Sequence, residues 1–283
     1  MKETTLNSIR KIKFQNLEIG GEDSFPILNP VYVLDVPIFN TDSIFSIAKN
    51  FYGSNDLKEI ITKAQISDCD ILGLKFNIEK SEQISVVIEL FKDLLPDLTK
   101  PLMLSGSGKD EIDSVLLPKL IENSDRRVIL NSVNENTYKD IIPYVIKGNH
   151  IVVLKSPIDI NLAKELNILS ADMGLSLDNM IIDTDIGGLG YGLEYGYSIM
   201  EKIKLEGLKG DKYLNMPIIS FGCGESLKTK EAKTDGYSSS WGTLEDRARF
   251  FELAAASSIK ACGADIIVMN YPPNISVMKE PEV

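Results

Sequence analysis

The sequence is poor in the residues that most often hold metals or transfer protons. It contains one histidine, His150, and three cysteines, Cys69, Cys223 and Cys262, which are far apart along the chain. The cysteines form no C-x-x-C pair, so they predict neither a disulfide framework nor a site for zinc or an iron–sulfur cluster. His150 opens an apolar run, which favours an imidazole buried at the start of a strand over a general base. The sequence therefore predicts no catalytic residue and no metal ligand.

Long hydrophobic runs and an excess of positive charge are also missing. No apolar run approaches the roughly 18 residues of a membrane span, and no signal-peptide-like stretch follows Met1. The net charge is −11 at pH 7 and the isoelectric point is near 4.8, which disfavours binding to phosphate backbones and anionic membranes. We expect a cytoplasmic protein with no nucleic-acid partner and no membrane association.

Eight short apolar runs recur along the chain, with amphipathic stretches of helical periodicity between them. The runs lack alternation between apolar and polar residues, which is typical of strands buried on both faces of a parallel sheet. Among the helical stretches, residues 243–261 open with Thr243-x-x-Asp246, a variant of the helix capping box. The eight predicted strands lie at residues 31–34, 70–74, 101–104, 127–130, 151–154, 180–182, 217–219 and 266–269.

This alternation predicts an α/β protein, a (β/α)8 TIM barrel. The length of 283 residues suits such a barrel, which commonly needs about 250. A doubly wound open sheet is the main rival, but no G-x-G-x-x-G follows the first predicted strand. We expect one barrel domain over residues 1–283, with residues 1–29 as an N-terminal extension and the last helix short or missing. The polar stretch at residues 226–240 is expected to be a functional loop.

Functional groups of a TIM barrel lie just after the C-terminal end of each strand. The third predicted strand is followed by Ser105 and Gly106, the fourth by Asn131 and the sixth by Asp183. These residues predict a polar mouth whose glycine and amide groups suit hydrogen bonding to a large ligand. As an alternative, Asp183 and Asp185 would simply cap the next helix.

The densest motif follows the sixth predicted strand. Between Asp183 and Tyr197 the chain carries five glycines and three tyrosines, including Gly188, Gly190 and Gly192. The motif predicts a glycine loop that leads into a helix, and its spacing is not that of a phosphate-binding P-loop. We expect these three glycines to let the backbone approach a cofactor closely.

The glycine-tyrosine motif resembles a segment of the small subunit of the corrinoid iron–sulfur protein, whose archaeal counterpart is the delta subunit of the acetyl-CoA decarbonylase/synthase complex. The chain departs from that family after the eighth predicted strand, where Asn270 and Tyr271 stand in place of a basic residue and a histidine. Collinear matches cover nearly the whole chain, at residues 19–26, 186–201, 209–212, 228–233, 241–242 and 261–269.

The resemblance implies a non-catalytic barrel subunit in the reductive acetyl-CoA (Wood–Ljungdahl) pathway of carbon fixation. It implies a heterodimer with a large subunit that holds the cobalamin and the iron–sulfur cluster. The barrel would cap the cobalamin while a methyl group passes from methyltetrahydrofolate, or an analogue, to acetyl-CoA synthase. A methyltransferase and acetyl-CoA synthase would be transient partners. Cofactor contacts would come from Ser105, Gly106, Asn131, Asp183, Gly188, Gly190 and Gly192.

A second function stays open, that of a stand-alone pterin-binding TIM-barrel methyltransferase. Pterin-binding barrels place an asparagine after the fourth strand and an aspartate after the sixth, and Asn131 and Asp183 occupy these places. Ser105 stands after the third strand, where pterin-binding barrels often have an aspartate. We favour the subunit that caps a corrinoid, because the glycine-tyrosine motif is the more specific signal.

Overall fold

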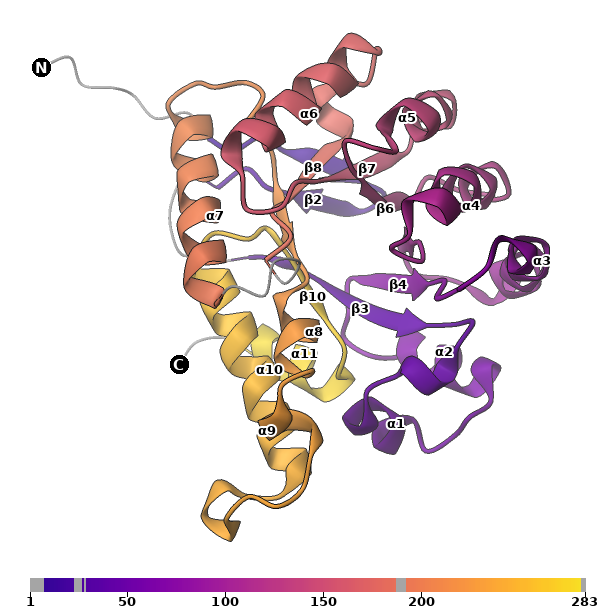
Figure 1. Cartoon of the computed structure of the whole chain (residues 1–283), viewed down its shortest axis with the longest axis vertical. Helices are drawn as coiled ribbons and strands as arrows, with labels where there is room; N and C mark the ends of the chain where they lie inside the picture. The colour runs from indigo at the N-terminus through magenta and orange to yellow at the C-terminus, as the bar shows by residue number, and fades with distance from the viewer. Residues whose placement is uncertain (1–7, 23–26, 28, 187–191, 281–283) are drawn as a thin grey trace, which may run out of the picture.

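Eight parallel strands close into a barrel in the computed structural model, which describes residues 8–22, 27, 29–186 and 192–280. The order around the barrel is β10-β3-β4-β5-β6-β7-β8-β9 (Figure 1). Each of the eight predicted strands is therefore confirmed. The strands are β3 (Val31–Pro37), β4 (Ile71–Lys75), β5 (Leu102–Ser105), β6 (Ile129–Val133), β7 (Ile151–Lys155), β8 (Met180–Asp183), β9 (Ile218–Ser220) and β10 (Ile266–Met269).

Helices connect the strands and surround the barrel, as short crossovers between parallel strands require (Figure 1). The capping box predicted for α10 is confirmed, because the Thr243 side chain accepts from the Asp246 N–H and the Asp246 side chain accepts from the Thr243 N–H. The helices are α1 (Ser46–Tyr52), α2 (Leu57–Gln65), α3 (Ile84–Leu94), α4 (Asp110–Glu122), α5 (Tyr138–Lys147), α6 (Ile160–Asp172), α7 (Leu193–Leu208), α8 (Gly222–Ser226), α9 (Lys230–Lys233), α10 (Leu244–Ala261) and α11 (Pro272–Lys279).

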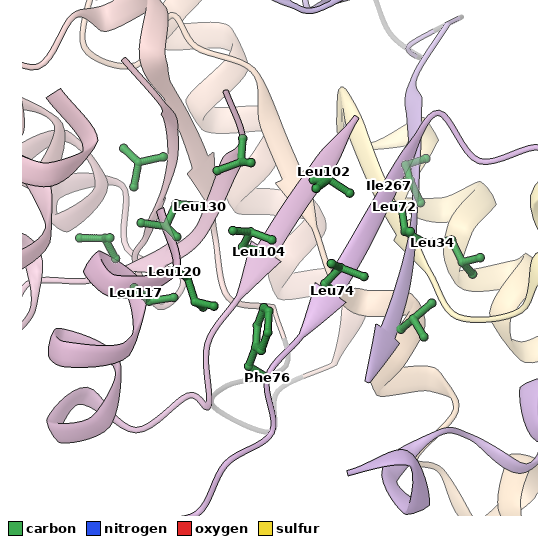
Figure 2. Packing of buried hydrophobic residues seen from close by; sticks show 14 of the residues in the cluster. Leu34, Leu72, Leu74, Phe76, Leu102, Leu104, Leu117, Leu120, Leu130 and Ile267 are labelled. Atoms are coloured by element: carbon green, nitrogen blue, oxygen red, sulfur yellow. The ribbon is translucent and has the colours of Figure 1, made fainter. Parts of the chain in front are cut away.

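Two apolar cores lie on the two sides of the strands. Alternate residues such as Leu104 on β5 and Leu130 on β6 belong to the cluster outside the barrel, which also contains Leu117 and Leu120 of α4 (Figure 2). The strand residues that face the opposite way, including Ile71 on β4, form a separate cluster inside the barrel. Because both faces are buried, the strands read as continuous apolar runs in the sequence.

A hairpin before the barrel belongs to the interior cluster and was not predicted. Strands β1 (Ile12–Phe14) and β2 (Leu17–Ile19) pair antiparallel. Their side chains Ile12, Phe14 and Ile19 are at most 1% exposed and pack with the interior residues of the barrel strands. Because they join the strand residues that lie nearest the N-terminal strand ends, the hairpin closes that end of the barrel.

Two connections differ in detail from the predicted pattern. The stretch at residues 226–240 is not one continuous loop, because it contains α9 and the start of a 3-10 helix at Ser239–Trp241. The last helix, α11, is short, as predicted. It has eight residues and begins with Pro272. None of the helices in the described ranges has the length and apolar character to cross a membrane.

Candidate functional site

The interior of the barrel changes from apolar to polar at the C-terminal ends of the strands. The change follows the alternation along each strand: Val31 and Val33 belong to the interior cluster, and Asp35 is the next residue on the same face. A cavity of about 200 Å³ opens at this level. Its lining includes interior-facing side chains near the C-terminal ends of six strands, namely Asp35, Lys75, Ser105, Asn131, Lys155 and Asp183.

Asn131 and Ser105 form one side of this cavity. The Asn131 Nδ2 donates to Ser105 Oγ at 3.1 Å, across the neighbouring strands β6 and β5. Asn131 Oδ1 is buried and has no hydrogen-bond partner among the described residues. A buried amide oxygen without a partner costs about 1–3 kcal/mol, so this oxygen is available to a donor from a bound molecule.

Asp183, at the end of β8, has a strongly perturbed carboxyl group. Its side chain is buried, and burial raises its pKa from 3.8 to about 7, although the backbone N–H of Asp185 donates to its Oδ1 at 2.9 Å. The negative charge of Asp185 also raises this pKa, and the Lys155 ammonium lowers it. Lys155 and Asp185 form an ion pair at 3.2 Å beside it. A carboxyl group that titrates near neutral pH can accept or donate a hydrogen bond to a ligand.

The loop after β5 is held in place by a buried carboxylate from the next helix. Asp113 of α4 accepts from the Ser107 N–H at 2.7 Å, the Ser107 hydroxyl at 2.8 Å and the Gly108 N–H at 2.8 Å. A Cβ atom at Gly106 would lie 2.5 Å from Asp113 Oδ1. Glycine is therefore required at position 106 for this loop to wrap around Asp113.

Four of the seven predicted site residues come together at the cavity: Ser105, Gly106, Asn131 and Asp183. Gly192 is the residue before α7, is exposed and does not line the cavity. Gly188 and Gly190 lie outside the described residues. The alternative that Asp183 or Asp185 caps the next helix is wrong, because α7 begins only at Leu193.

The predicted mouth omitted Asp35 and Lys75, which add charge to a site expected to be largely neutral. Asp35 is 8% exposed, and burial raises its pKa while the nearby Lys75 ammonium lowers it. A sequence signal for both residues exists. Side chains two residues apart on a strand point to the same face. Asp35 stands two residues after the interior Val33, and Lys75 stands two residues after Gly73 and four after the interior Ile71.

The residue types that bind metals lie away from the cavity or are dispersed. Within the described ranges, no group of three or more His, Cys, Asp and Glu side chains is arranged to hold a metal ion. His150 stands at the start of β7, at the opposite end of the barrel, where its Nδ1 accepts from the Val128 N–H at 3.2 Å. Burial lowers the pKa of His150. The three cysteines are free and buried.

Comparison with solved structures defines the class of barrel. The chain superposes on the dihydropteroate synthase of Yersinia pestis with a TM-score of 0.60, at 11% identity and with 95% of this chain and 96% of that chain covered. The enzyme from Xanthomonas albilineans, solved with 7,8-dihydropteroate, gives a TM-score of 0.60 at 13% identity, with 96% and 100% covered. The chain is thus a TIM barrel with the fold of dihydropteroate synthases.

Sequence comparison identifies the family. Residues 42–269 match the model of the CO dehydrogenase/acetyl-CoA synthase delta subunit, and the chain belongs to this family. The acetyl-CoA decarbonylase/synthase complex subunit delta of Methanocaldococcus jannaschii is 31% identical over 194 residues, covering 68% of this chain and 47% of the relative. The Methanopyrus kandleri subunit is 33% identical over 199 residues, covering 70% and 49%. The matched region thus spans about half the length of these relatives.

Proposed function

We propose that this chain is a barrel subunit that covers a corrinoid bound by a larger partner subunit and supports methyl transfer within an acetyl-CoA decarbonylase/synthase complex. Membership of the delta-subunit family is the observation that carries the proposal. The barrel itself acts as part of a methyl carrier rather than as a catalyst. The methyl group comes from methyltetrahydrofolate or an analogue and goes to acetyl-CoA synthase.

The dimensions of the mouth fit a ligand that lies over it. Pockets that enclose drug-sized ligands measure about 300–1,000 Å³, whereas the cavity beside Asn131 and Asp183 measures about 200 Å³. A corrin ring would therefore rest on the rim, with its polar side chains directed inward. The unpartnered Asn131 Oδ1 and the Asp183 carboxyl are suited to accept hydrogen bonds from such side chains. When bound, the corrinoid supplies the cobalt that carries the methyl group.

The partner would hold both the corrinoid and the iron–sulfur cluster. His150 lies at the opposite end of the barrel from the mouth, and Cys223 is a buried thiol whose pKa is raised well above its ordinary value by burial. Neither residue is placed to ligate a cobalt ion at the rim. The stable assembly is a cytoplasmic heterodimer, with the methyltransferase and acetyl-CoA synthase as transient partners.

The test measures protection of the methyl–cobalt centre. The chain is co-expressed with its corrinoid partner, and demethylation by an external thiol is followed by absorbance for the pair and for the partner alone. We expect one gel-filtration peak of summed mass and slower demethylation in the pair. Asn131→Trp, which fills the cavity, should abolish the protection, whereas Asn16→Trp, on the exposed turn of the N-terminal hairpin, should not. Equal rates for the pair and the partner alone would refute the proposal.

A pterin-binding methyltransferase is the second candidate, and the position of two residues favours it. Asn131 and Asp183 both line the cavity, as the pterin-binding pattern predicts. A cavity of about 200 Å³ is also closer to the size of a bicyclic heterocycle than of a corrin. One feature disfavours this candidate. Ser105, which accepts a hydrogen bond from Asn131, stands where pterin-binding barrels often have an aspartate, so the cavity lacks that carboxylate.

Calorimetry with methyltetrahydrofolate separates the two candidates. The corrinoid proposal expects no tight binding of the pterin to the isolated chain. Tight binding that is lost in Asp183→Ala would replace our preferred function by the second one.

A further inference from the structure

A second cavity lies beside the first, on the side of the mouth formed by β3, β10 and α8. It measures about 250 Å³ and shares Asp35, Lys75, Phe221 and Glu225 with the first cavity. Asn270, the residue after β10, lines this second cavity and a small void behind it, and does not line the first cavity. Neither the family resemblance nor the pterin-binding pattern gives a role to this side.

Two buried oxygens in this cavity have no protein partner. Asp35 Oδ1 and Asn270 Oδ1 each lack a hydrogen-bond partner in the described part of the chain, and each residue is 8% exposed. Nearly all buried polar atoms in native proteins are hydrogen-bonded, so two unpartnered acceptors from different parts of the chain at one cavity need an explanation. The carboxyl oxygen of Asp35 and the amide oxygen of Asn270 can both accept hydrogen bonds, and a ligand with N–H donors would satisfy them together.

The surrounding structure holds both oxygens in place. Asn270 is positioned by Glu252, whose carboxyl accepts from the backbone N–H of Asn270 at 2.6 Å. Glycines keep clear the space beside the oxygens: a Cβ at Gly73 would lie 3.1 Å from Asp35 Oδ1, and a Cβ at Gly224 would lie 3.2 Å from Asn270 Oδ1. These arrangements describe a preorganised pair of acceptors.

We propose that the cavity lined by Asp35, Asn270 and Lys75 is a second binding subsite, specific for a primary amide or an amino group on a heterocycle. The two N–H donors of such a group would pair with Asp35 and Asn270, and an amide carbonyl would accept from the Lys75 ammonium. A neutral group suits the site better than an ammonium ion, because Lys75 already supplies positive charge near Asp35. On the proposed function, the group is a carboxamide on the corrinoid rim.

The test uses acetamide as the smallest primary amide, with methyl acetate as the analogue that lacks N–H donors. Crystals of the full chain are soaked in each, and binding to the chain in solution is followed by NMR. We expect acetamide nitrogen within hydrogen-bond distance of Asp35 and Asn270, and no ordered methyl acetate. Asp35→Leu, which removes both acceptor oxygens, should weaken acetamide binding about tenfold. Asn270→Ala should also weaken it, whereas Asp93→Asn, on the exposed face of α3, should not.

Each result decides the proposal. Only water between Asp35 and Asn270, or equal binding of the amide and the ester, would overturn the subsite. If Asp35→Leu does not fold, unchanged acetamide binding in Asn270→Ala would also overturn the subsite. Two probes distinguish the possible sources of the bound group. Binding of the chain to dicyanocobinamide, which has amide arms, is compared with its binding to tetrahydrofolate, which has an amino group on a heterocycle. Acetamide binding without dicyanocobinamide binding would preserve the subsite and refute the corrinoid as the source of its group. Dicyanocobinamide binding without acetamide binding would overturn the subsite and leave the proposed function standing.

Discussion

Replacement of Asp183 by asparagine should stabilise the barrel, and more at pH 8 than at pH 5. The Asp183 carboxyl is buried at the end of β8, where burial raises its pKa from 3.8 to about 7. Asparagine has the same shape, carries no charge and retains an oxygen that accepts from the Asp185 N–H. The substitution therefore removes the cost of a buried charge while the surrounding contacts remain.

The sign and size follow from the two pKa values. A carboxyl whose folded pKa is raised contributes most to folding below pH 3.8, and its contribution falls as the pH rises through about 7. A shift of about three units corresponds to about 4 kcal/mol when the group is ionised in both states. At pH 5 the folded carboxyl is still mostly protonated, so the gain from asparagine should be smaller by about 2–3 kcal/mol than at pH 8.

Urea unfolding followed by circular dichroism at both pH values measures the effect. The free energy of unfolding of Asp183→Asn should exceed that of the unsubstituted chain at pH 8, with a smaller difference at pH 5. Asp93→Asn, on the exposed side of α3, serves as the control and should show little change at either pH. Equal gains at the two pH values, or a loss at pH 8, would refute the assignment of a destabilising buried carboxyl.

Three further outcomes are expected for groups outside the ligand-binding side chains. Lys204→Met should lower the free energy of unfolding, measured by urea titration, by about 3–5 kcal/mol. The substitution leaves the buried carboxylate of Asp265 without the ammonium group that lies 2.5 Å from it. Lys202 is exposed on the same helix, so Lys202→Met should have little effect in the same titration. Asp113→Ala should speed amide hydrogen exchange in the loop after β5, since three hydrogen bonds to that loop are lost, and unchanged exchange would contradict its anchoring role. Phe14→Ala should cost about 3–5 kcal/mol by thermal or urea unfolding, and a negligible cost would show that the hairpin does not close the barrel.

The barrel could be predicted from the sequence because its strands are buried on both faces. Runs such as residues 151–154 and 266–269 consist of consecutive apolar residues, and this pattern survives whatever the exact register. The start of α10 was equally predictable, since a Thr243-x-x-Asp246 box depends only on local spacing. The hairpin at residues 12–19 was not predictable, because three-residue strands carry too little pattern to distinguish them from a loop.

The candidate site was only partly predictable, for a geometric reason. Ser105, Asn131 and Asp183 were found because they stand at strand ends where the apolar run stops. Asp35 also follows a predicted apolar run, at residues 31–34, but the apolar Val36 comes next and β3 continues to Pro37, so Asp35 lies within the strand. Lys75 directly follows the predicted run at residues 70–74. The alternation of interior and exterior positions then shows that both side chains face the mouth.

The interior of the barrel is most informative where it departs from what stability alone would select. Apolar side chains fill the barrel interior toward the N-terminal ends of the strands. If apolar side chains also filled the C-terminal end, the barrel would bury more apolar area and would not have to desolvate charged groups. The chain instead places Asp35 and Lys75 on one side of the mouth and Asp183 on the other. The two carboxyls are buried and both have raised pKa values, so each carries a cost that a bound ligand can offset with hydrogen-bond donors. Their placement on opposite sides of the mouth favours one broad ligand held at two edges over a small molecule held at one.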